Sequence, residues 1–314
     1  MSFSITVAIA VSSDSRRIFN TLESLAECMI PDSLRQVLVV ENGEAPRLAE
    51  GVRRFAERLP VRHVFTETIG KSPALNWAIR NYVEDESFII FTDDDVRFNP
   101  NWLVNYETAF RRHGRGGYFG SVLGVDYEIE PAPAIKTLLP VSARGHASET
   151  AAIKRRFFLG CNWACHRSDL VAAGMFSERF GPGSSTGATG QETEMQERLR
   201  RNGVKRVYVQ NNMVWHYVPR EKCTFEWIKE RSRRIGVESY LKTPNRGVWV
   251  RKKLRAVARS AVRLAMGDGA FYYRLIVNSV VLGSFVSAWM RLGRDARGRE
   301  AADKEDGWIE RRPG

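Results

Sequence analysis

The sequence has few cysteines and no segment typical of an export signal. Its four cysteines are irregularly spaced: Cys28, Cys161, Cys165 and Cys223. The closest two, Cys161 and Cys165, are not followed by a second pair of metal ligands. We therefore expect buried thiols rather than a disulfide framework or a zinc site, which favours a reducing cytosol. The opening residues lead into a strand pattern without a basic segment or cleavage site, so we expect no secretion signal.

Acidic residues are outnumbered, and the imbalance is local. The net charge is +12 over 314 residues, yet residues 222–263 contain 13 Lys and Arg against 3 Glu, a net of +10. Such a local excess argues against a nucleic-acid coat. It predicts a basic surface that faces the phosphates of lipid headgroups or of a polyanionic substrate. We therefore expect no nucleic-acid partner.

No long hydrophobic run is clean enough to predict a membrane span. Beyond Pro219 the periodicity predicts helices at residues 225–235, 248–266 and 272–290. The last of these is mostly apolar, but it contains Asn278 and follows Arg274. A basic helix followed by an apolar one is typical of an interfacial anchor on an anionic leaflet. Packing on the preceding domain, or on a second subunit in a homo-oligomer, is the equal alternative.

The pattern divides the chain into three parts. From Ile5 to about Val209, short apolar runs alternate with amphipathic stretches, which is typical of an α/β domain with mainly parallel strands. The glycine-rich segment 181–190 is predicted to be a mobile loop, and we interpret it as a lid. Strands are predicted at residues 5–11, 36–40, 61–65 and 87–92, and helices at 72–82 and 192–201. The predicted parts are 1–219, a helical extension at 220–294 and a charged, disordered tail at 295–314.

The most informative segment is an apolar run that ends in three carboxylates. Phe88-Ile-Ile-Phe-Thr92 has the composition of a strand buried on both faces, and Asp93, Asp94 and Asp95 follow it. Carboxylates at this end of a strand sit where an open α/β sheet binds ligands. They repel one another unless a cation neutralises them, and hard oxygen ligands suit Mg²⁺ or Mn²⁺ shared with a substrate's phosphates. A solvated acidic turn is the alternative.

Further motifs follow one another in order along the chain. They are Val39-Val-Glu-Asn-Gly43, Gly70-Lys-Ser-Pro-Ala-Leu-Asn76, Thr92-Asp-Asp-Asp-Val96, Gly160-Cys-Asn162, Gly174-Met-Phe-Ser-Glu178, Gly190-Gln-Glu-Thr-Glu-Met195 and Trp215-His216. Together, over about residues 5–240, they resemble the GT-A glycosyltransferases of family 2, inverting enzymes that use nucleotide sugars. The resemblance implies a Rossmann-like α/β fold, a mainly parallel sheet flanked by helices, with a C-terminal helical extension.

The resemblance implies a divalent metal as cofactor, Mg²⁺ or Mn²⁺. Asp93 and Asp95 would hold it, with Asp95 the preferred direct ligand, and His216 would complete the site through a neutral imidazole nitrogen. Such an ion neutralises the negative charge that develops on the departing phosphate when a sugar–diphosphate bond breaks. A strand-end histidine bonded to the backbone is the alternative for His216.

The resemblance also implies contacts to a nucleoside diphosphate sugar. These are assigned to Val11, Glu41, Asn42, Lys71, Asn76, Asp93 and Asp94. Glu41 resembles the acidic residue that contacts the base or ribose, while Lys71 is either a phosphate contact or a surface lysine. Val11-Ser-Ser-Asp14 departs from the family's usual Tyr-Asn-Arg, so the sequence does not distinguish UDP, GDP and dTDP donors.

Inversion needs a base that takes the proton of the acceptor hydroxyl. The resemblance places Glu192 there, although the family's usual Glu-Asp pair is Gln191-Glu192 here, so the carboxylate is on a longer side chain. Glu194 is the competing candidate, and the preference for acids in a first helical turn is the alternative for both. The acceptor side is assigned to Asn162, Trp163, Gly190, Glu194, Trp227 and Arg231.

The leading hypothesis is the transfer of a single sugar to a glycan or lipid-linked glycan. We expect a cytoplasmic protein, peripheral at the inner face of the cell membrane. The Gln-x-x-Arg-Trp signature of processive synthases is absent, which favours single addition. A nucleotidyltransferase is one alternative, but it should show a glycine-rich basic loop at residues 11–16. A non-enzymatic basic binding module is the other, and it leaves Glu192 and His216 without a role.

Overall fold

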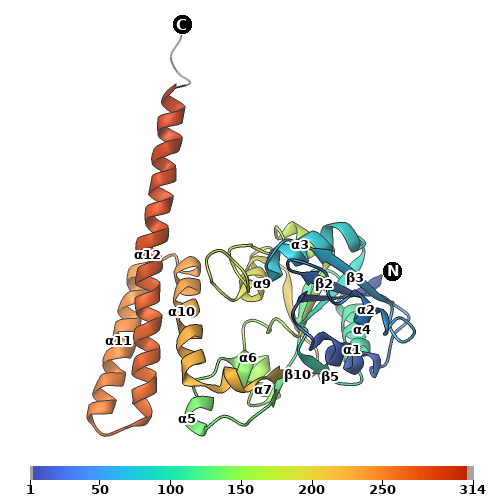
Figure 1. The fold of residues 1–314 in the computed structure, drawn as a ribbon, viewed down its shortest axis with the longest axis horizontal. Helices are drawn as coiled ribbons and strands as arrows, with labels where there is room; N and C mark the ends of the chain where they lie inside the picture. Colours follow the sequence, from blue (N-terminus) through green and yellow to red (C-terminus); the bar gives the residue numbers. More distant parts are fainter. Residues whose placement is uncertain (1–2, 310–314) are drawn as a thin grey trace. The chain divides into compact units, whose positions relative to one another are not determined.

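The chain forms two compact units (Figure 1). The computed structural model describes residues 3–309, with side chains omitted at residue 270 and at 293–309. The α/β unit contains the residues up to Thr186 together with Gly190–Thr224. The helical unit contains Gly187–Thr189 and the residues from Phe225 onward.

The α/β unit is built on a seven-stranded sheet. Its order is β3 (Val61–Thr66), β2 (Leu34–Asn42), β1 (Ser4–Ser12), β4 (Ser87–Thr92), β8 (Trp163–His166), β6 (Gly117–Gly120) and β9 (Lys205–Tyr208). All neighbours are parallel except the two pairs that β8 makes, with β4 and with β6. The predicted strands at residues 5–11, 36–40, 61–65 and 87–92 are therefore confirmed, as is the mainly parallel sheet.

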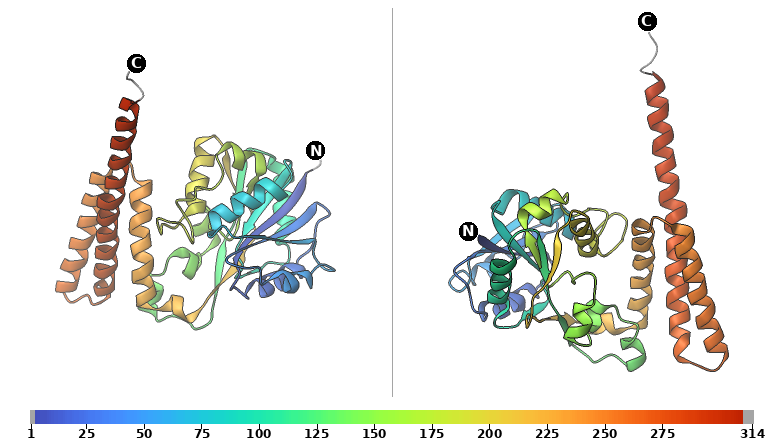
Figure 2. Two further views of the ribbon diagram at one scale, coloured as in Figure 1. Left: turned by 45° about the horizontal axis from the view of Figure 1, so that its top comes forward. Right: turned by 180° about the vertical axis from the view of Figure 1, so that it is seen from behind.

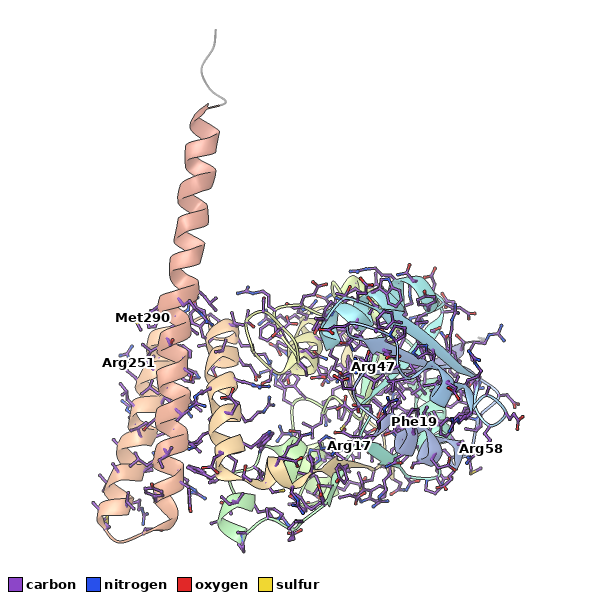
Figure 3. The ribbon with its side chains drawn as sticks, in the orientation of Figure 1. Arg17, Phe19, Arg47, Arg58, Arg251 and Met290 are labelled. Carbon is purple, nitrogen blue, oxygen red and sulfur yellow. The ribbon has the colours of Figure 1, made fainter. Side chains whose placement is uncertain are left out.

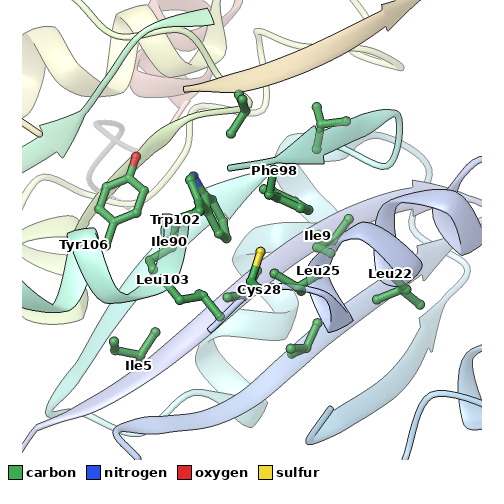
Figure 4. Packing of buried hydrophobic residues seen from close by; sticks show 14 of the residues in the cluster. Ile5, Ile9, Leu22, Leu25, Cys28, Ile90, Phe98, Trp102, Leu103 and Tyr106 are labelled. Carbon is green, nitrogen blue, oxygen red and sulfur yellow. The ribbon is translucent and has the colours of Figure 1, made fainter. Parts of the chain in front are cut away.

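Helices cover both faces of this sheet because successive residues of a strand point to opposite sides. On one side, Ile5 and Ile9 of β1 belong to the same core as α1 (Ile18–Ala26) and α4 (Trp102–His113), as Figure 4 shows. On the other side, Ala8 and Ala10 pack with α3 (Lys71–Tyr82) and α9 (Gln191–Arg201). Alternate residues of one strand therefore serve two cores.

A second, three-stranded sheet brings distant residues to the end of β4. Its order is β5 (Val96–Phe98), β10 (Val214–Val218) and β7 (Leu123–Tyr127). In this sheet His216 pairs with Val96, the residue directly after the acidic triplet. The backbone N–H of Tyr217 also donates to the carbonyl oxygen of Asp95 at 2.8 Å. A strand some 120 residues further along the chain thus completes the surroundings of the triplet.

The glycine-rich segment 181–190 contains no helix and no strand. Its start is fixed on α3, because Pro182 accepts the N–H of Lys71 at 3.1 Å and Phe180 accepts the hydroxyl of Ser72 at 2.7 Å. The predicted role as a lid stays a prediction.

The helical unit consists of α10 (Phe225–Lys242), α11 (Arg246–Ala265) and α12 (Ala270–Ile309), which lie side by side in both views of Figure 2. Their shared core includes Tyr240, Trp249 and Phe285, and the last two rings stack at 4.0 Å. The three predicted helices are confirmed. The expectation that the last apolar stretch is too short and too interrupted to span a membrane differs from the structure: residues 271–292 of α12 are long and apolar enough to cross one, judged by length and composition only.

The charged segment from Asp295 differs from the expectation of disorder. Over 295–309 the backbone continues α12, and 310–314 lie outside the described residues. The physical reason is helix propensity: alanine, arginine and glutamate are strong helix formers, so a stretch rich in them can be helical without an apolar face to bury.

Candidate active site

The acidic triplet lies at the carboxyl end of β4, as the sequence predicts. All six residues of β4 are buried, and the hydroxyl of its last residue, Thr92, donates to the carbonyl oxygen of Cys161 at 3.0 Å. Asp93, Asp94 and Asp95 are only partly buried. They lie beyond the end of a parallel strand, which is where open α/β sheets bind their ligands.

Three side chains at this position could hold one cation. Asp93, Asp95 and His216 each offer a ligand atom, and these atoms lie within 4.8 Å of one another. Nε2 of His216 is 3.1 Å from Oδ1 of Asp95, in an arrangement that leaves this buried oxygen without a hydrogen bond. A buried carboxylate oxygen without a hydrogen bond is costly. Two carboxylates and an imidazole are suitable donors for a Mn²⁺-type ion, so these residues fit the implied metal.

The neighbouring carboxylates have different electrostatic surroundings. Burial favours the neutral acid at Asp95, but His216 and the Lys222 ammonium, 3.6 Å from Oδ2, outweigh it and hold the pKa of Asp95 below its usual value. Asp94 accepts a hydrogen bond from the hydroxyl of Ser15, and burial together with Asp95 raises its pKa. Asp94 is therefore bonded to Ser15 and is not among the three residues, Asp93, Asp95 and His216, that could hold a cation.

Lys71 connects the metal-ligand cluster to the candidate base. Its Nζ lies 2.5 Å from Oδ1 of Asp93 and 2.9 Å from Oε1 of Glu192. Burial disfavours its charge, but the two carboxylates outweigh burial and raise the pKa of Lys71. The structure therefore does not support a plain surface lysine, which was one of the two sequence interpretations.

The start of α9 positions Glu192. Gly190 precedes the helix with φ 76° and ψ 33°, a left-handed conformation that glycine adopts without strain. Gln191 accepts from the hydroxyl of Ser72 at 2.8 Å and donates to Oε1 of Glu192 at 3.1 Å. A Cβ on Gly160 would lie 2.4 Å from that same oxygen, so the carboxylate fills the space that this glycine leaves. Gln191, which departs from the family's usual residue, therefore orients the carboxylate of the candidate base.

Glu192 is held in the form that a base needs. Burial favours its neutral acid, but the ammonium of Lys71 outweighs burial, and the pKa of Glu192 lies below its usual value. The competing candidate has a different partner: both carboxylate oxygens of Glu194 accept from Arg198, at 2.7 and 2.8 Å. Arg198 also donates to the carbonyl oxygens of Ala173 and Met175. This ion pair holds Glu194 in a structural contact, and the geometry favours Glu192.

We expect Lys71→Met to shift the pH dependence of the reaction. Without the ammonium, burial alone acts on Glu192, so its pKa rises and the base becomes protonated at a higher pH. The acidic limb of kcat/KM for donor hydrolysis, measured at saturating Mn²⁺, should move upward by about one pH unit or more. Lys205→Met, at an exposed position on β9, is the control and should leave the limb in place. An unchanged limb in the Lys71 variant would mean that another group titrates.

The residues assigned to the donor are not equally available for contact. Asn76 exchanges two hydrogen bonds with the backbone of Phe176, at 2.8 and 2.9 Å, and is buried. Glu41 has no exposed surface, and its oxygens accept from the N–H groups of Arg47 and Leu48 and lie 2.6 Å from Nε2 of His63. The amide of Asn76 and the carboxylate of Glu41 thus have partners within the protein. Their contacts with the donor stay predictions.

Val11 and Asn42 lie together at the ends of β1 and β2. The amide of Asn42 donates to the carbonyl oxygen of Val11 at 2.8 Å, and its Oδ1 accepts from the N–H of Gly70 at 3.3 Å. These bonds join the loops that follow the two strands. A contact of Val11 or Asn42 with the donor stays a prediction.

The residues assigned to the acceptor side fall into two groups, one buried in the core of the α/β unit and one in the helical unit. Asn162 is fully buried and accepts from Trp102 and Tyr106 while donating to two carbonyl oxygens, and Trp163 is buried and stacks on Phe91 at 4.7 Å. Both therefore build the core beneath the site. Trp227 and Arg231 belong to α10 of the helical unit. Their place on the acceptor side stays a prediction.

Four residues of the site were not assigned from the sequence. Ser15 and Ser72 donate to Asp94 and Gln191, Gly160 leaves room for Glu192, and Lys222 lies near Asp95. Small and hydroxylic residues in loops carry no sequence signal of this kind. Ser72 lies in the motif at residues 70–76, from which only Lys71 and Asn76 were assigned, and its position next to Lys71 is the one hint that the sequence offers. The buried thiols of Cys161 and Cys165 are confirmed, with burial raising the pKa of each.

Comparisons with known proteins support the fold. The fold is similar to that of the mannosyltransferase PcManGT from Pyrobaculum calidifontis, solved with GDP-Man and Mn²⁺, at 18% identity and a TM-score of 0.52 over 97% of this chain and 80% of the other. It is also similar to GalNAc-T7, solved with UDP, GalNAc and Mn²⁺, at 12% identity and a TM-score of 0.50 over 76% of this chain and 50% of the other. A search of curated proteins found no match.

The sequence model of glycosyl transferase family 2 matches residues 6–171, which is more than half of the chain. The matched range contains β1 to β4, the acidic triplet, Lys71 and Gly160, and ends before Glu192 and His216. The nucleotidyltransferase and the non-enzymatic binding module are thereby set aside. The chain belongs to glycosyl transferase family 2 and is a glycosyltransferase with the GT-A fold.

Proposed function

We propose that the protein transfers one sugar from a nucleoside diphosphate sugar to a hydroxyl group of its acceptor, with inversion, in a metal-dependent reaction. The observation that carries this proposal is the chain of contacts from Asp93 through Lys71 to Glu192. Through these contacts, the single side chain of Lys71 connects the candidate base to a candidate metal ligand. Among the residues that the structure describes, Lys71 forms ion pairs with Asp93 and Glu192, and Glu192 is the one of the two outside the metal-ligand cluster, which supports Glu192 as the base.

The residues of the site have distinct roles in this reaction. Glu192 takes the proton of the acceptor hydroxyl, and Gln191 and Gly160 fix the direction of its carboxylate. Lys71 keeps that carboxylate ionised and carries a positive charge beside Asp93. Asp93, Asp95 and His216 would hold a divalent ion, which when bound supplies Lewis-acid stabilisation of the departing diphosphate. The ligands of the two similar structures support a purine or pyrimidine nucleoside diphosphate with Mn²⁺.

The proposed function is tested by screening donors. The full-length protein is incubated with a panel of UDP-, GDP- and dTDP-sugars, with Mn²⁺, with Mg²⁺ and with EDTA, and release of the nucleoside diphosphate is measured. We expect hydrolysis of one class of donor, dependent on the metal, with the released sugar first appearing as the inverted anomer by NMR. Retention of the anomeric configuration, or failure to hydrolyse any donor with either metal, would overturn the proposal.

We further propose that the helical unit contacts an anionic membrane surface, which would place the enzyme at the inner face of the cell membrane. Helix α11 contains seven Lys and Arg and no acidic residue. Large apolar side chains on α11 and α12 are exposed, among them Leu254, Val262, Trp289 and Met290; Figure 3 labels Met290 and the basic Arg251. Exposed apolar groups next to basic ones are typical of interfacial helices, and an enzyme held at a membrane would suit a lipid-linked glycan acceptor.

We expect the full chain to sediment with phosphatidylglycerol vesicles and much less with phosphatidylcholine vesicles. Each basic residue near an anionic surface contributes about 1 kcal/mol, so replacing Arg251, Lys252 and Arg255 by Gln should weaken binding roughly 100-fold. The control replaces Arg53, Arg111 and Arg112, exposed arginines of the α/β unit, by Gln and loses the same charge. Equal partitioning of both variants would contradict the proposal, and a stable dimer without vesicle binding would favour packing on a second copy.

A further inference from the structure

A pocket of about 560 Å³ lies on the α/β unit, outside the site described above. It is formed by the connection between β7 and β8, which contains the short helices α5 (Pro133–Lys136), α6 (Val141–Arg144) and α7 (Glu149–Ile153). We call it the basic pocket. Its lining is Pro133, Lys136, Thr137, Val141, Arg144, Gly145, His146, Ala147, Ala151 and Arg155. The lining contains three cationic side chains and no carboxylate.

Two of the cations have no partner in the part of the chain that the structure describes. Lys136 forms an ion pair with Glu130, but neither Arg144 nor Arg155 makes a side-chain hydrogen bond or ion pair there. Arg144 and Arg155 line the same pocket, and burial together with Arg144 lowers the pKa of Arg155. Both side chains are exposed at the pocket, so an anion that enters it could pair with both guanidinium groups.

His146 adds a neutral donor to the same lining. Its Nδ1 accepts the backbone N–H of Leu123 at 2.9 Å, so the proton of the neutral ring is on Nε2. Burial, together with Arg155 and Arg144, lowers the pKa of His146 to about 4, so the ring is neutral at physiological pH. The imidazole therefore presents an N–H donor without adding charge.

The basic pocket is joined to the candidate active site through β7. Gly145, with φ 71°, turns the chain so that the N–H of His146 donates to the carbonyl oxygen of Leu123 at 2.8 Å. Leu123 is two residues before Val125, which pairs with His216 on β10. Neighbouring strands are about 4.8 Å apart and a strand rises about 3.3 Å per residue, so the backbone of His146 lies roughly 12 Å from that of His216. The pocket and the candidate metal ligand His216 are therefore on neighbouring parts of the α/β unit.

We propose that the basic pocket binds a phosphate group carried by the acceptor. The donor's diphosphate is assigned to the metal-ligand cluster, so a second phosphate-binding position serves the other substrate. Arg144 and Arg155 would pair with the phosphate oxygens, and Pro133, Val141 and Ala151 provide an apolar wall beside them. A phosphate ester attached to a hydrocarbon chain could contact both the arginines and the apolar wall. A soluble sugar phosphate could contact the arginines alone. This inference rests on the proposed function only for naming the ligand as an acceptor.

The test measures binding of two phosphate monoesters to the full-length protein in EDTA, so that no metal can bind them at Asp93 and Asp95. Geranyl phosphate represents a lipid-linked phosphate, and glycerol 3-phosphate represents a soluble one. We expect Arg144→Gln with Arg155→Gln to weaken binding roughly 100-fold by calorimetry, because two charge-assisted contacts are lost. Arg53→Gln with Arg112→Gln removes the same charge elsewhere and should have no effect. Ala151→Glu, which introduces a carboxylate into the wall, should weaken binding similarly.

Each outcome decides the proposal. Tighter binding of geranyl phosphate supports a lipid-linked acceptor, and equal binding of both probes supports a soluble phosphorylated acceptor. No binding of either probe, or an equal loss in the Arg53 and Arg112 control, overturns the proposal. Metal-dependent donor hydrolysis should be unchanged in the pocket variants, and circular dichroism should show an unchanged unfolding midpoint. A chain that binds the probes but hydrolyses no donor would refute the glycosyl-transfer proposal while leaving the phosphate site in place.

Discussion

Glu192→Gln should lower the rate of sugar transfer by roughly 10²- to 10⁴-fold, the contribution of a general base. The amide cannot take the acceptor's proton, although it has nearly the same shape and keeps a contact with Lys71. Affinity for the nucleoside diphosphate should be unchanged within about two-fold, since the metal-ligand cluster is not altered. Single-turnover kinetics with a labelled donor and calorimetry with the diphosphate and Mn²⁺ measure the two effects separately.

Glu194→Gln is the matched control because it removes a carboxylate two residues away on the same helix. Glu194 pairs with Arg198, so its loss should reduce stability modestly and leave transfer within about five-fold of the parent. If the Glu194 variant loses transfer and the Glu192 variant retains it, the base has been assigned to the wrong carboxylate.

Asp95→Asn should remove most of the Mn²⁺-dependent affinity for the donor. The asparagine oxygen carries no charge, so one of the two anionic ligands is lost from a cluster of three. We expect the affinity for the diphosphate at fixed Mn²⁺ to fall roughly 100-fold or more. Calorimetry with and without EDTA separates the metal-dependent part, and titration of free Mn²⁺ by electron paramagnetic resonance measures the ion directly.

Asp94→Asn provides the comparison within the same triplet. Asp94 accepts from Ser15 and is not a member of the three-ligand cluster, so its substitution should change the Mn²⁺-dependent affinity less than about ten-fold. Equal losses in the two variants would show that the ion is not held by Asp93, Asp95 and His216 as the geometry indicates.

The sequence predicts the centre of the sheet well because β1 and β4 are buried on both faces. Ser87–Thr92 and Ser4–Ser12 appear as nearly continuous apolar runs, and such runs leave few alternatives to a parallel sheet. The end of β4 is equally predictable, since three adjacent carboxylates cannot belong to a core. His216 and Glu192 were assigned to the site from the resemblance to the family, because no spacing rule connects them to the triplet.

Other features depend on tertiary contacts that the sequence does not encode locally. The hydrogen bonds of Asn76 and Asn162 run to residues 100 and 40 to 60 positions away, so their internal roles could not be read from their motifs. The bridge from Lys71 to Glu192 spans 121 positions and depends on the packing of α3 against the start of α9. The helical residues 295–309 illustrate the opposite case, in which local propensity outweighed overall composition.

The late position of β10 links catalysis to the completion of synthesis. During translation Asp95 leaves the ribosome long before His216 and the N–H of Tyr217 that bonds the Asp95 carbonyl oxygen. Pairing across such a long stretch of chain is slow relative to local structure. A partly made chain therefore has the acidic triplet without His216, and the proposed ion-binding group would be complete only after nearly the whole α/β unit has emerged.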